Sequence, residues 1–204
     1  MSYGQIKVKR YADPPFDKKE IFKYMQSPVA SDETEALFLA CSEECRGASR
    51  LCAAYTELDI KHTEDGSLDL GFAITDSRSL AKHLEGCDKA ILFAATAGIG
   101  YDRLIMRYKR LSAGKALCFQ AIGSERAEAV CDLLCADIKE QYSAQGYTPI
   151  ARFSPGYADL PLSLQAQIFK ALDCPRTLGI TLSDGFLMSP TKSVTAIVGL
   201  KKIQ

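Results

Sequence analysis

The sequence lacks the features that mark several large functional classes. It has only two histidines among 204 residues. Both are expected on the surface without a partner, which argues against a histidine metal site or a Ser-His-Asp triad. No C-x2-C pair of the kind used by zinc sites is present. Lys plus Arg and Asp plus Glu number 25 each, and this balance argues against a nucleic-acid or anionic-membrane binder.

Long apolar segments are also missing. No apolar run approaches the roughly 18 to 20 residues of a membrane span, and the N-terminal stretch MSYGQIKVKRYADPPF has no apolar segment long enough for a signal peptide. We therefore expect a soluble, cytoplasmic protein. The composition, 47% hydrophobic and 25% charged, is that of an ordinary globular protein with enough residues to bury a core.

Eight cysteines are present, and without a signal peptide they are expected to be reduced thiols. Cys41, Cys45 and Cys52 recur with Leu37 and Ala48 at helical spacing, which is typical of small residues packing in a core. An iron–sulfur cluster of the radical-generating type would need C-x3-C-x2-C, but the third position falls at Ala48. We expect no metal site.

The order of the predicted elements indicates the fold class. Ser31 and the acidic residues after it predict the start of a helix within 31–55. The runs on either side of Asp65-Gly66 predict a hairpin. The rest predicts a short helix around 78–85, a strand, glycine turn and helix within 89–111, a mostly helical segment 113–146 that restarts at Ser124 or runs through Gly123, a helix over 162–172 and a strand within 193–202. This order predicts an α+β fold with a mainly antiparallel twisted sheet flanked by helices.

Two patterns suggest ligand sites but admit plain structural readings. Gly98-Ile99-Gly100 supplies two glycines of a dinucleotide-binding loop, yet Arg103 occupies the third position, so a strand–helix turn is favoured. Glu128 and Asp132 lie one helical turn apart and repel unless a cation lies between them. They form either a solvated acidic face or a site for an ammonium or sulfonium group, and the residues alone leave both alternatives open.

The stretch RFSPGYADLP (152–161) combines three chemical features. Arg152 can bind a carboxylate through two hydrogen bonds. Pro155-Gly156 sets a turn that lets the backbone approach a ligand, and Tyr157 offers a ring face and a hydroxyl. Taken alone, a structural turn with a surface arginine is favoured over a ligand site.

This stretch resembles the R-x-x-P-G-Y signature of the activation domain of cobalamin-dependent methionine synthase. The likeness extends downstream to Leu182, Ser183, Met188, Pro190, Ser193 and Val194, and upstream to FQAIGSERAEAVCDLL (119–134), which looks like a helix of short, free-standing members. The resemblance is good over 90–204 and weak over 1–90. It implies that 1–204 form one domain of this type, with S-adenosylmethionine bound in the C-terminal part.

The resemblance also implies roles for individual residues. Arg152 would hold the methionyl carboxylate, and Glu128 would lie near the amino group of S-adenosylmethionine. The backbone at Ser154 and Gly156 would contact the adenosine, while Tyr157 would line the methyl end. No residue is expected to act as a catalytic acid, base or nucleophile, because positioning and electrostatics suffice when cofactors carry the chemistry. Asp13, Asp17 and Asp32 are alternatives for a further amino-group partner.

The resemblance implies a function in trans. The sequence has no corrinoid-binding motif, so cobalamin is expected only through a partner, a cobalamin-bearing methyltransferase similar to methionine synthase. A flavodoxin-type protein is a candidate electron donor. We therefore expect a reactivation subunit for reductive methylation of cob(II)alamin. The alternatives are a non-catalytic docking or ligand-sensing module for a corrinoid protein, or a reactivator of another corrinoid methyltransferase.

Overall fold

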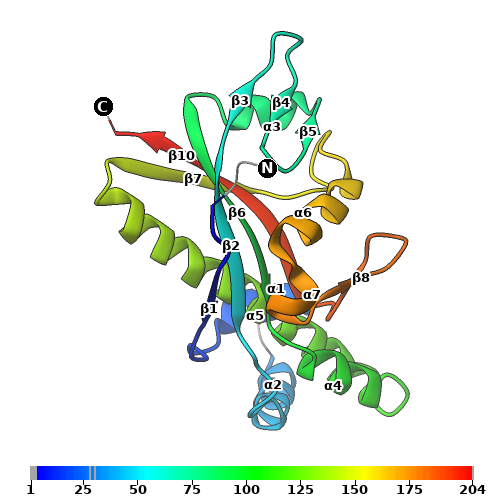
Figure 1. Ribbon diagram of the computed structural model, residues 1–204. Coiled ribbons are helices and arrows are strands. Elements are labelled where there is room, and N and C mark those ends of the chain that lie inside the picture. The colour runs from blue at the N-terminus through cyan, green and yellow to red at the C-terminus, as the bar shows by residue number, and fades with distance from the viewer. Residues whose placement is uncertain (1–3, 28, 30, 204) are drawn as a thin grey trace.

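The computed structural model describes residues 4–27, 29 and 31–203, which fold around a five-stranded antiparallel sheet (Figure 1). In spatial order its strands are β1 (Lys7–Arg10), β2 (Cys52–Asp59), β6 (Cys87–Thr96), β10 (Ser193–Lys202) and β7 (Tyr147–Phe153). The C-terminal strand thus lies between β6 and β7, and β7 forms one edge of the sheet.

Two small sheets and seven α-helices complete the described fold. The small strands are β3 (Lys61–His62), β4 (Leu68–Asp69) and β5 (Ile74–Thr75) in one sheet, and β8 (Thr181–Leu182) and β9 (Met188–Ser189) in the other. The helices are α1 (Lys18–Tyr24), α2 (Asp32–Glu44), α3 (Arg78–His83), α4 (Gly100–Tyr108), α5 (Ala113–Ser143), α6 (Gln165–Leu172), preceded by a 3-10 turn at Leu162–Leu164, and α7 (Cys174–Leu178).

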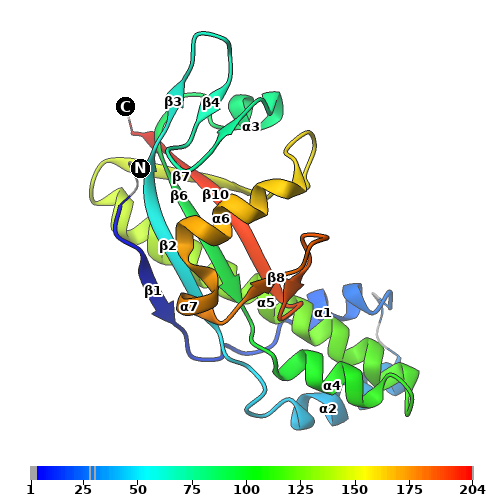
Figure 2. The ribbon, with the colours of Figure 1, turned by 45° about the vertical axis from the view of Figure 1, so that its right-hand side comes forward.

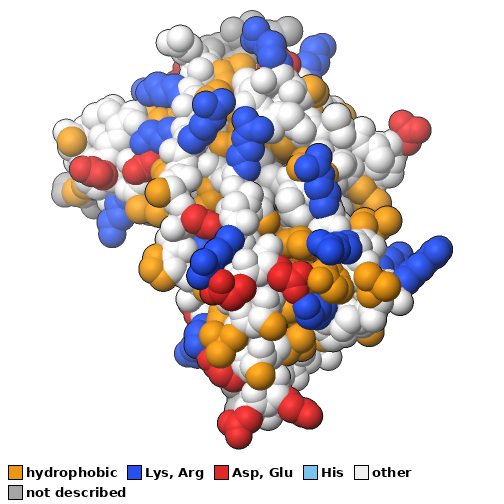
Figure 3. Space-filling model, turned by 90° about the horizontal axis from the view of Figure 1, so that it is seen from below, with side chains coloured by type: hydrophobic (Ala, Val, Ile, Leu, Met, Phe, Trp, Pro, Cys, Tyr) orange, Lys and Arg blue, Asp and Glu red, His pale blue; other side chains and the backbone are white. Residues whose placement is uncertain are grey.

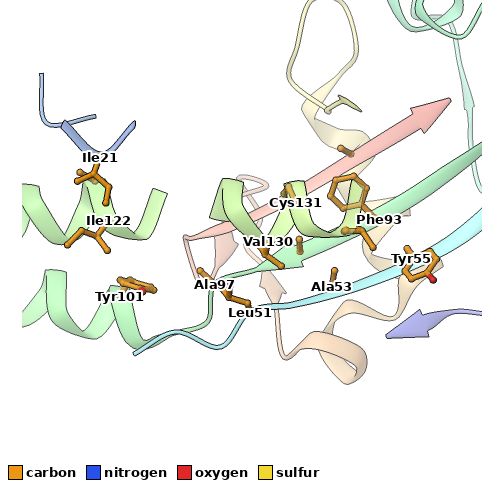
Figure 4. Packing of buried hydrophobic residues seen from close by; sticks show 14 of the residues in the cluster. Ile21, Leu51, Ala53, Tyr55, Phe93, Ala97, Tyr101, Ile122, Val130 and Cys131 are labelled. Atoms are coloured by element: carbon orange, nitrogen blue, oxygen red, sulfur yellow. The ribbon is translucent and has the colours of Figure 1, made fainter. Parts of the chain in front are cut away.

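Helices cover both faces of the large sheet (Figure 2), and a separate hydrophobic core lies beneath them on each face. Side chains alternate across a strand, so in β6 Phe93 joins the core beneath α1, α2, α4 and α5, whereas Leu92 joins the core beneath α3, α6 and α7. Figure 4 shows Phe93, Tyr55 and Ala53 of the sheet near Val130 and Cys131 of α5. Burial on both faces explains why β6 is a nearly continuous apolar run.

Helix α5 runs unbroken through Gly123, so it does not restart at Ser124. A side chain at position 123 would begin about 3.0 Å from Lys192 and Tyr101, which explains why glycine is accommodated in mid-helix. Ser112 caps the start of the helix, and its hydroxyl accepts from the Lys115 amide. A 31-residue helix is therefore available to line one side of the molecule.

The structure corrects several sequence-based predictions. The helix begun at Ser31 ends at Glu44, and Cys52 lies in β2 rather than on the helical face shared by Cys41 and Cys45. The hairpin around Asp65-Gly66 forms, but its paired strands have two residues each. The elements β1, α1 and β7 were not predicted, because they are short or lack a clear apolar period.

A buried arginine ties the N-terminal segment to α5. Arg126 is 0% exposed, and all five of its N–H groups donate hydrogen bonds. The acceptors are both carboxylate oxygens of Glu125, the Asp13 carboxylate at 3.0 Å, and the carbonyls of Pro14 and Pro15 at 2.6 and 3.1 Å. Burial would lower the pKa of Arg126, but Glu125 and Asp13 raise it above its ordinary value, so the guanidinium stays charged.

A β-bulge sets the direction of Arg152. Strand β10 pairs Val198 with Arg152 and Leu200 with Pro149, so two residues of β7 lie opposite the single residue Gly199. Ile150 and Arg152 would share a face in a regular strand. With the bulge, Ile150 packs against the core beneath α3, while Arg152 reaches the carboxylates of α5.

The face seen from below carries basic, acidic and apolar side chains together (Figure 3). Exposed apolar residues on the helices and turns around α2 and α4 are Leu39, Met106, Leu111 and Leu117.

Within the described ranges, no helix combines the length and apolar character that a membrane crossing requires.

Replacing Arg126 with Met should lower the free energy of unfolding by about 3 kcal/mol, because Glu125 would stay buried without its cation and two proline carbonyls would lose their donors. Urea denaturation measures this change. Arg46→Met is the matched control, since Arg46 makes an exposed ion pair with Glu43 and its loss should change stability by less than about 1 kcal/mol. Equal losses in the two variants would contradict the anchoring role of Arg126.

Gly199→Ala should destabilise the protein by about 1–3 kcal/mol through overpacking. A Cβ there would lie 2.7 Å from Leu84 Cδ2, 2.8 Å from Cys87 Sγ and 2.9 Å from Ile150 Cδ1. Gly114→Ala is the control, because that helical position has only an ordinary contact at 3.6 Å and alanine favours the helix. Thermal unfolding that leaves Gly199→Ala as stable as the wild type would show that the bulge tolerates a side chain.

Candidate functional site

The main candidate site is a cavity of about 370 Å³ between the N-terminal segment and α5. One wall comes from the segment that Arg126 anchors and from α1, and the other is a stripe along α5. The lining residues are Pro14, Pro15, Asp17, Glu20 and Tyr24 on the first wall, and Glu125, Arg126, Glu128, Ala129, Asp132, Leu133 and Ala136 on the second. The spacing of the α5 set is that of one helical face.

The lining of this cavity is electronegative. It contains five carboxylates, those of Asp17, Glu20, Glu125, Glu128 and Asp132, against the single guanidinium of Arg126. The remaining lining residues are mostly apolar, which suits a ligand that is partly hydrophobic. A ligand with a cationic group is therefore favoured over one that carries only negative charge.

Arg152 lies beside this cavity and supplies the cation between Glu128 and Asp132. Its Nη2 donates to Glu128 Oε2 at 3.0 Å and to Asp132 Oδ1 at 3.1 Å. Among the described residues, neither Nε nor Nη1 makes a hydrogen bond to an oxygen. The guanidinium therefore keeps donors with which it could bind a planar carboxylate.

The surroundings of Arg152 keep it charged. Burial opposes the charge, but the carboxylates of Glu128 and Asp132 raise the pKa of Arg152 above its ordinary value. Burial raises the pKa of the Cys131 thiol to about 12, so this cysteine is a neutral neighbour at physiological pH. The same effect, strengthened by the charge of Glu128, raises the pKa of Tyr24 across the cavity.

A second cavity of about 420 Å³ adjoins the first along α5 and β7. It shares Asp132 and Ala136 with the first cavity. Its other lining residues are Cys135, Lys139, Pro149, Ile150, Ala151, Arg152 and Val198. Arg152 and Asp132 thus lie at the junction of the two spaces.

The turn after β7 holds the remaining predicted residues. Gly156 has φ +87°, in the region that favours glycine, and its amide donates to the Leu160 carbonyl at 2.8 Å. The Tyr157 amide donates to the Ser154 carbonyl at 3.2 Å. The Tyr157 ring is 67% exposed and packs edge-on against Phe153, with centroids 5.4 Å apart.

Neighbouring elements hold this turn in place. The Asp159 carboxylate accepts from the Ser77 hydroxyl and from the amides of Arg78 and Ser79, which caps α3. His83 on α3 makes a 2.7 Å hydrogen bond through Nε2 with the Ala151 carbonyl. The expectation that His83 has no partner was therefore wrong.

Not all five predicted site residues come together. Glu128 and Arg152 are in direct contact, and Glu128 lines the main cavity. Ser154, Gly156 and Tyr157 follow Arg152 in the turn but line neither cavity. The Gly156 amide hydrogen is used within the turn, so only the carbonyl of that residue is left for a ligand contact. The ligand roles of all five remain predictions.

The N-terminal wall was missed from the sequence. Of the three aspartates considered for an amino-group contact, Asp17 lines the cavity, Asp13 pairs with Arg126, and Asp32 is not a lining residue. Tyr24 and Glu20 had no signal of their own, since α1 is only seven residues long. The α5 stripe could have been found from its period of three and four. Among the described residues, no group of three or more His, Cys, Asp or Glu side chains is placed to hold a metal ion.

Comparison with known proteins gives two findings. The family model for the activation domain of vitamin B12 dependent methionine synthase matches residues 71–202. A crystal structure described as the MetH reactivation domain bound to AdoHcy is similar in fold, with a TM-score of 0.72 and 15% sequence identity over 96% of this chain and 78% of that chain. No protein with a curated description matches this chain in sequence.

These findings confirm the predicted α+β fold with its mainly antiparallel sheet flanked by helices. They also confirm the family resemblance drawn from RFSPGYADLP and its downstream partners. The family match covers well over half of the sequence. The chain therefore belongs to the family of vitamin B12-dependent methionine synthase activation domains.

Proposed function

We propose that this chain binds S-adenosylmethionine at the Arg152 site and positions its methyl group for the reductive methylation of cobalamin held by a separate chain. The observation that carries the proposal is the contact of Arg152 with Glu128 and Asp132 beside a cavity lined by acidic residues. Family membership and a similar fold seen with bound AdoHcy support the same choice of ligand.

The described residues fit this ligand in charge and size. S-adenosylmethionine carries a carboxylate, an ammonium and a sulfonium. Arg152 would bind the carboxylate, Glu128 the ammonium, and the acidic lining would favour the sulfonium. A volume of about 370 Å³, beside the adjoining cavity of about 420 Å³, lies in the range of small-molecule sites.

The sulfonium would supply a methyl group to a cobalamin that receives one electron from a flavodoxin-type donor, leaving S-adenosylhomocysteine. The residues of this chain would bind and orient the ligand, without any proton transfer. Tyr157 would lie at the methyl end, and its exposure leaves the ring accessible to a partner. The backbone around Ser154 and Gly156 would contact the adenosine.

The proposed partner is a cobalamin-bearing methyltransferase similar to methionine synthase, in the cytoplasm. The alternatives of a docking or ligand-sensing module, or of a reactivator for another corrinoid methyltransferase, make different predictions about binding. A docking module would bind its corrinoid partner equally well with and without S-adenosylmethionine. Reactivation requires cobalamin methylation that depends on both S-adenosylmethionine and an electron donor.

Arg152→Ala should weaken S-adenosylmethionine binding by at least about tenfold, because a charged pair with the carboxylate is lost. Glu128→Gln should weaken it by about five- to tenfold through loss of the ammonium contact. Isothermal titration calorimetry of the purified variants measures both changes. Arg107→Ala is the matched control, since Arg107 is exposed on α4 and away from both cavities. An unchanged dissociation constant for Arg152→Ala would refute the carboxylate contact.

S-adenosylmethionine should bind about fivefold more tightly than S-adenosylhomocysteine at low salt. The thioether lacks the positive charge of the sulfonium, and one charge about 8 Å from a net negative surface contributes about 1 kcal/mol. The difference should shrink at 0.5 M NaCl because salt screens it. Equal affinities at low salt would mean that the acidic lining does not act on the ligand's sulfur.

A further inference from the structure

Two carboxylates on α5 bind the same nitrogen of Arg152, but they differ in exposure. Glu128 Oε2 lies 3.0 Å and Asp132 Oδ1 3.1 Å from Nη2. The Glu128 side chain is 46% exposed and the Asp132 side chain 72% exposed. Exposed ion pairs contribute little because water solvates the separated charges nearly as well. Asp132 is therefore the partner that Arg152 can release at lower cost.

Asp132 also occupies a distinctive place among the cavities. It lines both spaces, whereas Glu128 lines only the first and Arg152 only the second. The Asp132–Arg152 ion pair consequently stands at the boundary between them. Separation of this pair would open a continuous path along α5, from the acidic cavity to the apolar walls formed by Pro149 and Ile150.

The negative charges at Arg152 already outnumber its one positive charge. One guanidinium faces two carboxylates, so the group carries a net charge of −1 in the structure. A ligand carboxylate arriving at Nε and Nη1 would place a third carboxylate around this one guanidinium, and the ligand ammonium beside Glu128 would balance only one of the three. Like charges at this separation repel, so binding of that carboxylate favours the departure of one resident carboxylate.

We propose that Asp132 is a specificity-determining residue that competes with the ligand carboxylate for Arg152. This inference rests on the proposed function. In the free protein Asp132 holds the guanidinium and divides the two cavities. On binding, the ligand carboxylate pairs with the guanidinium at Nε and Nη1 and Asp132 leaves Nη2, while Glu128 remains beside Arg152 and the ligand ammonium. Every ligand with a carboxylate has to displace Asp132 from Arg152. Asp132 therefore disfavours carboxylate ligands that do not also fill the rest of the site.

Removal of the competing charge should improve binding. Asp132→Asn should tighten S-adenosylmethionine binding about two- to fivefold, the range expected for loss of an exposed ion pair. Glu128→Gln, which removes the same charge from the same nitrogen, should weaken binding. A purely structural role for both carboxylates would change affinity in the same direction.

A ligand without the carboxylate separates competition from general electrostatics. Decarboxylated S-adenosylmethionine keeps the ammonium and sulfonium, so Asp132→Asn should leave its affinity unchanged or reduce it. Glu140→Gln is the charge control, because Glu140 is exposed on the same helix and lines neither cavity. In an Arg152→Ala background, Asp132→Asn should give no gain. Thermal unfolding checks that each variant is folded.

The calorimetric outcomes are distinct. Tighter binding of S-adenosylmethionine with no gain for the decarboxylated ligand supports competition by Asp132. An equal gain for both ligands, or no gain for either, overturns it while leaving the proposed function intact. If wild-type protein binds neither ligand and Asp132→Asn also binds neither, the proposed function fails, and the inference that rests on it fails too.

Discussion

The buried guanidinium of Arg126 is the interaction on which the candidate site depends. The segment before α1 contains two consecutive prolines, whose missing N–H groups leave few ways to fix it by strand pairing. Arg126 supplies donors to both proline carbonyls and to Asp13, and its own charge is balanced by buried Glu125. Phe16 covers the guanidinium, with its ring centroid 4.6 Å from Cζ. One side chain thereby fixes a wall of the cavity.

The opposite side of the site depends on backbone irregularity. A regular β7 would send Ile150 and Arg152 to the same face, and one of them would meet the wrong surroundings. The bulge opposite Gly199 lets the apolar side chain enter a core and the charged side chain reach α5. An edge strand can tolerate such a bulge, because only one neighbouring strand has to accommodate the shift. The position of Arg152 in the site thus depends on one irregular step in the pairing of β7 with β10.

Sequence patterns predicted the parts of the fold that rest on local signals. The cap at Ser31, the helical segment predicted over 113–146 and the apolar run of β6 all mark elements that form. The short elements β1 and α1 depend on long-range contacts, with β2 and α5 respectively, and a sequence pattern does not show these.

The same distinction holds within the site. Arg152 and Glu128 were identified from their motif, and their direct contact follows from the fold. The bulge that makes the contact possible gives no pattern in the sequence, since it arises from pairing with β10. Likewise, the electronegative character of the cavity appears only when α1 and α5 are brought together from positions about a hundred residues apart. The residues that carry the chemistry could be predicted from local motifs, whereas the shape of the cavity around them could not.

The helical spacing of Glu128 and Asp132 fixes the distance between their side chains. Residues four apart on a helix stay about 6 Å apart at their Cβ atoms, and the sheet that α5 packs against prevents the helix from bending to change that spacing. The single nitrogen Nη2 of Arg152 reaches both carboxylates at about 3 Å, while a bare metal ion, whose bonds to oxygen are shorter, would have to draw them closer together. The two carboxylates therefore select a cation by its size as well as by its charge.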